Sequence, residues 1–241
     1  MTSAYEWAAE EFGHAELGDA RRTQRLVAIA AESLARPSGL ITRVADSSAS
    51  REGAYRFVEN DAVDIDRLGG AMFAACARRL VGATNVIVAV DQSTLSFVDS
   101  AGKKGLGPVN GVENPHRLGF EVMSALAVLP DGQSIGLLAQ DWHVRSAERS
   151  PTLHRDKRPI EQRESGLWHC CIGGALDTLR EHAPGVRPWF QLDRGGDIGH
   201  VLVAASQLDA DFTFRACWDR KLDTGGYLRR AVRSTRCLGI A

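Results

Sequence analysis

The stretch NVIVAVDQSTLSF, residues 85–97, decides the fold that we expect for this chain of 241 residues. Its first part, residues 86–90, is an unbroken apolar run of mostly β-branched side chains, which predicts a strand covered on both faces. Asp91 follows at once, and a carboxylate at the end of a buried strand needs a hydrogen bond, an ion pair or a cation. Two interpretations are open: a turn in which Asp91 bonds the backbone of Ser93 or Thr94, or a functional site.

The composition of the chain restricts which ligands it can bind and in which cellular compartment it is expected. The chain carries 29 basic and 30 acidic residues, so it has no overall basic field, and a polyanion must be bound by local patches. Its five cysteines are scattered and include no C-x-x-C pair, which argues against a disulfide scaffold or a zinc site. The acidic N-terminus lacks signal-peptide character, and no apolar run is long enough to span a membrane. We expect a soluble, cytoplasmic protein.

Residues 4–82 have a helical pattern, interrupted at residues 37–39, with helices beginning near Asp19, near Ser47 or Ser48, and at Asp64. Arginines cluster on the first two of these helices. One interpretation is a solvated surface with weak ion pairs to Glu52 and Glu59, and the other is a patch that binds phosphates of nucleic acid. The candidate DNA contacts of this region are Arg21, Arg22, Arg25, Arg43, Arg51, Tyr55 and Arg56.

From residue 85 the pattern becomes that of an α/β fold. A loop is expected at residues 99–115, and a Pro-Asp-Gly turn predicts a hairpin after it, so the first three strands should form an antiparallel meander. A long helix and a short strand that ends at Asp193 come next. The segments expected after the loop are strands at 117–129 and 134–144, a helix at 159–182, a strand at 188–192, a helix at 198–208 and a strand at 211–217.

The strand order brings two carboxylates together. A strand that follows a crossover helix returns parallel, commonly beside the first strand of such a meander, which would place Asp91 and Asp193 at the same edge of the sheet. Two adjacent carboxylates repel each other unless a divalent cation lies between them, and oxygen ligands favour Mg²⁺ over zinc. We therefore favour the site over the turn. Asp197 is expected to be the N-cap of the following helix.

The same segments carry a resemblance to a known family. The chain resembles the bacterial cut-and-paste DDE transposases of the insertion-sequence-four type, which have an RNase H-like catalytic core. The resemblance runs in register from about residue 7 to residue 219. Its motifs are LGDARRTQRLV (17–27), EGAYRF (52–57), VDQSTLSF (90–97), LLAQDWHVR (137–145), ESGLW (164–168) and DRGGDI (193–198).

The resemblance implies a helical DNA-binding domain at residues 1–82, followed at residues 83–241 by an incomplete RNase H-like domain, a mixed sheet flanked by helices. It makes Asp91 and Asp193 catalytic ligands of two Mg²⁺ ions, and it adds Arg194 to the candidate DNA contacts. The family's third ligand is a glutamate in a Tyr-x-x-Arg-x-x-Glu segment, which no residue here matches. The tail from residue 229 on is basic and does not have the pattern of a completed element, so we expect a truncated copy with little or no strand transfer.

The resemblance thus implies a DDE transposase whose complete form hydrolyses phosphodiesters and transfers strands with Mg²⁺. Its partners would be double-stranded DNA, both transposon terminal repeats and target, and a second copy of the chain in a homodimer on DNA. Two alternatives remain open: a non-catalytic protein that occupies transposon ends or inhibits a full-length copy, and a small Mg²⁺-dependent phosphoesterase that does not need the N-terminal arginines.

Overall fold

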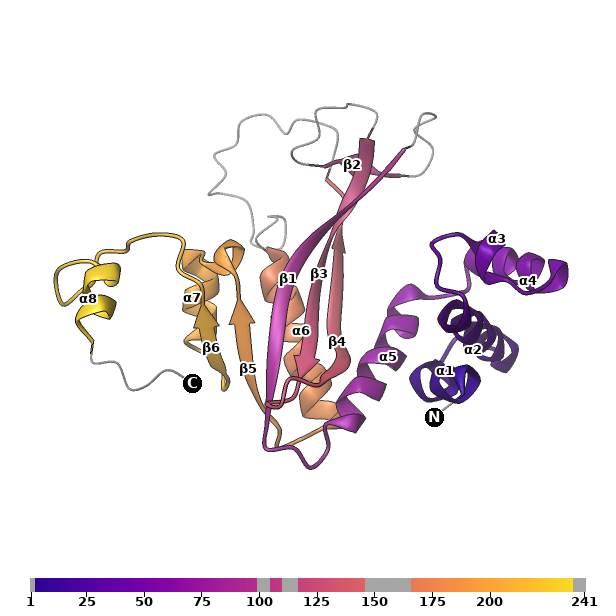
Figure 1. Ribbon diagram of the computed structural model, residues 1–241, viewed down its shortest axis with the longest axis horizontal. Coiled ribbons are helices and arrows are strands. Elements are labelled where there is room, and N and C mark those ends of the chain that lie inside the picture. Colours follow the sequence, from indigo (N-terminus) through magenta and orange to yellow (C-terminus); the bar gives the residue numbers. More distant parts are fainter. Residues whose placement is uncertain (1–2, 99–104, 110–116, 146–165, 236–241) are drawn as a thin grey trace.

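The computed structural model describes residues 3–98, 105–109, 117–145 and 166–235, and its first part is helical. Asp19 and Asp64 cap their helices with side-chain hydrogen bonds to backbone N–H groups, and Ser47 caps another, so the three predicted starts are confirmed. The helices are α1 (Ala4–Phe12), α2 (Ala20–Ala35), α3 (Ile41–Val44), α4 (Ser48–Val58) and α5 (Ile65–Arg79). They lie on one side of the molecule, beside a long twisted sheet (Figure 1).

The sheet is mixed. Its strands are β1 (Asn85–Val98), β2 (Gly107–Pro108), β3 (Arg117–Val128), β4 (Ser134–His143), β5 (Arg187–Leu192) and β6 (Asp211–Phe214). The order is β2-β3-β1-β5-β6, with β4 paired to β3. Strands β1, β3 and β4 form the antiparallel meander that the sequence predicts, whereas β5 runs parallel to β1 and β6 runs parallel to β5. Gly132, at φ 91°, makes the predicted turn between β3 and β4. The short strand β2 falls within the predicted loop.

Helices cover one face of the sheet. Helix α6 (Gly166–His182) and helix α5 pack against β4 and against each other, and α6 also contacts β3 and β1. Val86, Val88 and Val90 are fully buried on this side, while Ile87 and Ala89 on the other face are only half-buried. The expectation that this run is covered on both faces was therefore wrong within the described residues, because the run follows the alternation of a strand covered on one side. Residues 159–165 of the predicted long helix lie outside the described part.

Helix α5 belongs to two hydrophobic cores. Its first half packs with the N-terminal helices through Leu68, Ala71 and Met72, and its last turns pack into the sheet core through Cys76 and Leu80. At the junction, Arg79 ties three elements together. Its guanidinium lies 2.6 Å from the buried carboxylate of Glu11 on α1 and donates to the carbonyl of Ile135 on β4. Burial opposes the charge of Arg79, but the hydrogen bond with Glu11 outweighs it and raises the pKa of the guanidinium.

The C-terminal part differs in detail from the sequence prediction. After β5 come the 3-10 helix η3 (Arg194–Gly196), the helix α7 (Gly199–Ala205), β6 and a final helix α8 (Leu228–Ser234). Helix α7 and strand β6 are shorter than predicted, and the tail does contain an element, α8. The predicted α/β class, with N-terminal helices followed by a mixed sheet and flanking helices, is confirmed. Among the described residues, no helix is both long and apolar enough to cross a membrane.

Candidate functional site

The basic surface of the N-terminal helices is built where α2 meets α4. The side chain of Asp19 accepts a hydrogen bond of 2.8 Å from the backbone of Arg21 and so fixes the start of α2. One turn further on, the guanidinium of Arg25 lies against Gly53 of α4, and a Cβ added at Gly53 would be only 2.7 Å from its Cζ atom. Arg21 and Arg25 are both exposed. Because Gly53 has no side chain, it leaves the space on α4 that the Arg25 guanidinium occupies.

The seven candidate DNA contacts of this region divide by what they do in the fold. Arg22 donates a hydrogen bond of 2.8 Å to the carbonyl of Leu17 and holds the loop between α1 and α2. Arg56 pairs with Glu52 on the surface of α4, as the solvated-surface interpretation predicts for that pair. Tyr55 is exposed between the arginines. Within the described ranges, no hydrogen bond or ion pair is formed by the side chains of Arg21, Arg25, Arg43 and Arg51.

The two aspartates that the sequence singles out are brought side by side. Strands β1 and β5 are parallel neighbours, and their last paired residues are Val90 and Leu192. Asp91 and Asp193 each follow directly, on strands that lie about 4.8 Å apart. Strand β1 continues beyond Asp91, which is extended and pairs with Ser124 of β3. The turn interpretation of Asp91 was therefore wrong, because this residue is inside a strand.

The segment that follows β5, residues 193–196, packs closely against the core. Its carboxylate accepts a hydrogen bond of 2.7 Å from the backbone of Gly195 and caps η3. A Cβ at Gly195 or Gly196 would lie 3.1 or 3.2 Å from the ring of the buried Trp168 on α6, so this close approach requires small residues. Arg194, the candidate DNA contact between Asp193 and Gly195 in the chain, is exposed. The turn is thereby held by both Asp193 and the core.

Asp91 and Asp193 are both exposed at this edge, and their carboxylates are oxygen donors of the kind that Mg²⁺ accepts. Mg²⁺ commonly keeps several waters and takes only one or two protein carboxylates together with substrate phosphate oxygens, so the pair fits this ion. Across the described ranges, no group of three or more His, Cys, Asp or Glu side chains is arranged to hold a metal. Magnesium binding by the pair stays a prediction.

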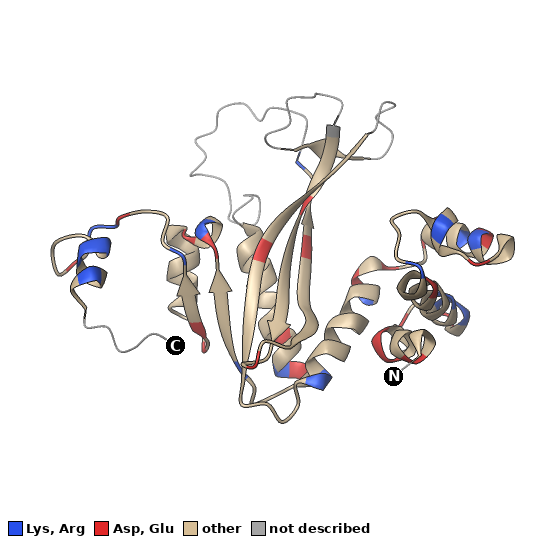
Figure 2. Ribbon diagram, viewed as in Figure 1, with Lys and Arg blue, Asp and Glu red and all other residues tan. Residues whose placement is uncertain are grey.

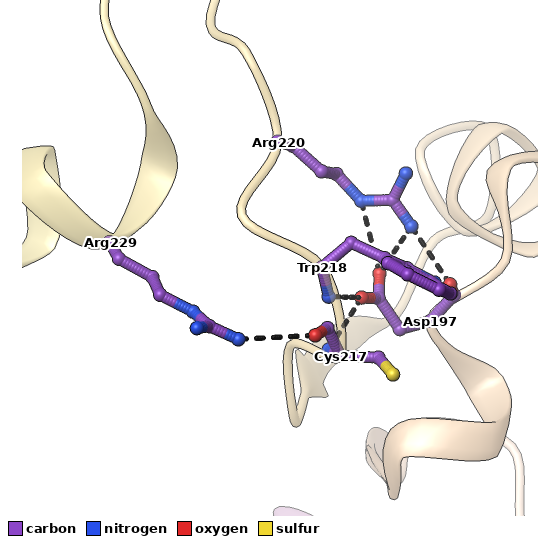
Figure 3. A network of polar contacts seen from close by, with 5 residues as sticks. All are labelled: Asp197, Cys217, Trp218, Arg220 and Arg229. Atoms are coloured by element: carbon purple, nitrogen blue, oxygen red, sulfur yellow. Dashed lines mark hydrogen bonds and ion pairs between the residues drawn. The ribbon is translucent and has the colours of Figure 1, made fainter.

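The prediction that Asp197 is the N-cap of the following helix was wrong. Asp197 is buried and does not cap α7, whose N-cap is Ile198. Instead its Oδ2 accepts from the backbones of Cys217 and Trp218, at 2.7 and 3.2 Å, and its Oδ1 accepts from the guanidinium of Arg220 at 2.6 Å (Figure 3). The partners are about twenty positions away in the chain, so no local sequence pattern reveals them.

Burial disfavours the charged form of Asp197, but the hydrogen bonds from Arg220, Cys217 and Trp218 outweigh that cost and lower the pKa of this carboxyl. Asp197 is therefore an ionised, fully partnered anchor in the fold rather than a free acid of the site.

Basic and acidic side chains occupy different parts of the molecule. Arginines gather on α2 and α4 at one end and on α8 at the other, and acidic residues of the sheet lie between them (Figure 2). The end of the molecule that carries α2 and α4 lies within a segment that matches a known family model. Residues 4–63, which span α1 to α4, match the family model described as transposase DNA-binding. This match supports DNA binding by a transposase and DNA as the partner of the N-terminal surface.

Proposed function

We propose that this chain is a DNA transposase of the DDE type. In this proposal α1 to α4 bind transposon-end DNA, and the strands that follow are an RNase H-like core of the insertion-sequence-four type. The observation that carries the proposal is the transposase DNA-binding match at residues 4–63. It is supported by the position of Asp91 and Asp193, which follow the last paired residues of two parallel neighbouring strands.

Each part of the site has a role in this function. Arg25 and Arg51, exposed and without partners among the described residues, contact phosphates of the DNA backbone. Asp91 and Asp193 hold Mg²⁺. When bound, Mg²⁺ ions supply an activated oxygen nucleophile and stabilise the charge of the leaving oxygen in phosphodiester hydrolysis and strand transfer. The hydrogen bond from Gly195 orients the carboxylate of Asp193 toward this role.

A second candidate function is occupation of transposon ends without catalysis. It is favoured by one observation: among the described residues, no group of three or more His, Cys, Asp or Glu side chains that could hold a metal includes Asp91 or Asp193. Both functions require the N-terminal arginines, whereas a small phosphoesterase would not. A measurement of metal binding then distinguishes the transposase function from the end-binding function.

DNA binding is tested by fluorescence anisotropy of the full chain with a labelled DNA duplex of mixed sequence. The affinity should fall with salt, and the variant R25Q/R51Q should reduce the slope of log affinity against log salt by about 2, since each lost phosphate contact contributes about 0.9. The control E59Q changes an exposed acidic residue at the end of α4. An unchanged slope in R25Q/R51Q would contradict DNA binding by this surface.

Metal binding is tested by thermal unfolding with Mg²⁺ or EDTA. Mg²⁺ should raise the Tm of the wild-type chain, because an ion that binds only the folded state stabilises it. D91N should remove this rise, and in EDTA it should itself raise the Tm slightly, because it relieves repulsion with Asp193. A wild-type Tm that is the same with Mg²⁺ and with EDTA would contradict the metal site and leave end binding as the function.

A further inference from the structure

The segment that follows β6 is held in place by polar contacts and not by a hydrophobic core. Helix α8 has no buried residue, and its seven residues are too few for a stable isolated helix. The backbone of Leu228 donates to the carbonyl of Arg220, and Arg229 is bonded both to Asp219 and to the carbonyl of Cys217. We call residues 215–233 the basic strap, and its position must come from these hydrogen bonds.

Asp197 is the anchor of the basic strap. Its carboxylate is 3% exposed and receives the backbone N–H groups of Cys217 and Trp218 together with the Arg220 guanidinium, which also donates to the Asp197 carbonyl (Figure 3). Such a buried and fully bonded carboxylate fixes three neighbouring residues at once. The strap is therefore tied to the turn that directly follows Asp193.

The first residue of the strap lies in line with the carboxylate pair. Leu192 of β5 pairs with Phe214 of β6, just as Val90 of β1 pairs with Leu192. The next residues along these three parallel strands are Asp91, Asp193 and Arg215, and the backbone of Arg215 donates to the Leu192 carbonyl. A cation thus follows two carboxylates across the same edge of the sheet.

The basic strap is also strongly cationic. It contains six basic side chains against two acidic ones, Asp219 and Asp223. In the described part of the chain, Arg215, Arg230 and Arg233 are exposed and form no side-chain hydrogen bond or ion pair. The arginine fork suits phosphate oxygens better than a lysine does. The six are Arg215, Arg220, Lys221, Arg229, Arg230 and Arg233, and those of α8 lie at the opposite end of the molecule from α2 and α4 (Figure 2).

We propose that the basic strap is a second DNA-binding surface, which contacts the phosphate backbone of double-stranded DNA on the far side of the Asp91–Asp193 pair from α2 and α4. This inference rests on the proposed function for its partner. Arg215 contacts the phosphate nearest the carboxylates, and Arg230 and Arg233 contact the duplex further along. Asp197 is a positioning residue, which acts through Arg220 and the strap backbone.

The test compares two pairs of neutral substitutions in the full chain, again with a labelled duplex of mixed sequence. R230Q/R233Q removes two exposed charges from α8. R78Q/R180Q removes the same net charge from the ends of α5 and α6, which precede β1 and β5 and so lie at the opposite edge of the parallel strands. All four arginines are exposed, so both variants should fold.

We expect R230Q/R233Q to weaken binding and to lower the salt slope by about 2, so that the loss of affinity between 50 and 200 mM salt shrinks about tenfold. The control R78Q/R180Q should keep the wild-type slope. Equal slopes in the two variants would overturn the inference, whether both are unchanged or both are lowered. A reduced slope in R25Q/R51Q in that same experiment would show that DNA binding by the N-terminal surface still stands.

Discussion

Replacement of Asp197 by asparagine tests whether this buried carboxylate holds the basic strap. The two side chains have the same shape, but one carboxylate oxygen becomes an NH₂ group that faces donors. A hydrogen bond to a charged group contributes about 1.5 to 3 kcal/mol, and the loss of one partner from a buried ion pair costs about 3 to 5 kcal/mol. Arg220 is 35% exposed, so water replaces part of what it loses. We therefore expect D197N to lower the free energy of unfolding by about 2 to 3 kcal/mol.

That loss corresponds to a fall in Tm of about 4 to 12 °C for a chain of this size. It should also depend on pH. The pKa of Asp197 is lowered in the folded state from its ordinary value of 3.8, so its stabilisation is complete above that value and is lost as the pH falls through the folded pKa. The stability gap between the wild-type chain and D197N should therefore be constant near neutral pH and should narrow below about pH 4.

Urea unfolding at several pH values measures this gap, and DNA binding gives an independent readout. D197N makes the chain more positive by one charge, so electrostatic attraction alone would strengthen DNA binding, whereas a displaced strap weakens it. We expect weaker binding. A cost below about 0.5 kcal/mol, the range of ordinary surface substitutions, would refute the role of Asp197 as an anchor. A folded D197N variant that binds DNA more tightly would refute its link to the strap.

Two further substitutions, each with a matched control, test the helical part. G53A should raise helix stability by up to about 1 kcal/mol while it displaces the Arg25 guanidinium and weakens DNA binding; G70A on α5, where an added Cβ meets nothing within 4 Å, should raise stability without a change in affinity. Equal DNA affinities in these two variants would contradict the role of Gly53. E11Q should cost about 2 to 3 kcal/mol in urea unfolding because it leaves Arg79 without its buried partner, whereas E10Q, at the exposed and longer contact of 3.5 Å, should cost less than about 1 kcal/mol.

The features predicted correctly from sequence are those with local or topological causes. Asp19 and Asp64 begin helices because their side chains accept hydrogen bonds from residues two or three positions ahead, which is a local pattern. The parallel placement of β5 beside β1 follows from the rule for crossover connections, and it alone brings Asp91 and Asp193 together. Each of these predictions needs only chain order and residue type.

The features that sequence did not predict depend on long-range contacts. Asp197 has the residue type and position of a helix cap, but donors about twenty residues away bind its carboxylate instead. Helix α8 has only seven residues and buries none of them, so hydrogen bonds to Asp219 and Cys217 hold it where an apolar face would hold a longer helix. The extension of β1 past Asp91 comes from its pairing with β3, which continues to Val98.

The shared helix α5 limits how DNA can reach the carboxylates in the proposed function. Its 15 residues make a rod of about 22 Å. Because one half packs with α1 and α2 and the other half packs on the sheet, with Arg79 bonded to both Glu11 and β4, the arginine surface cannot fold down onto the sheet without breaking a core. In the proposed function, DNA bound by α2 and α4 must therefore reach Asp91 and Asp193 while these helices keep their place beside the sheet. Because acidic residues of the sheet lie between the arginines of α2 and α4 and those of α8 (Figure 2), a duplex that spans both proposed DNA-binding surfaces would have to cross the carboxylates.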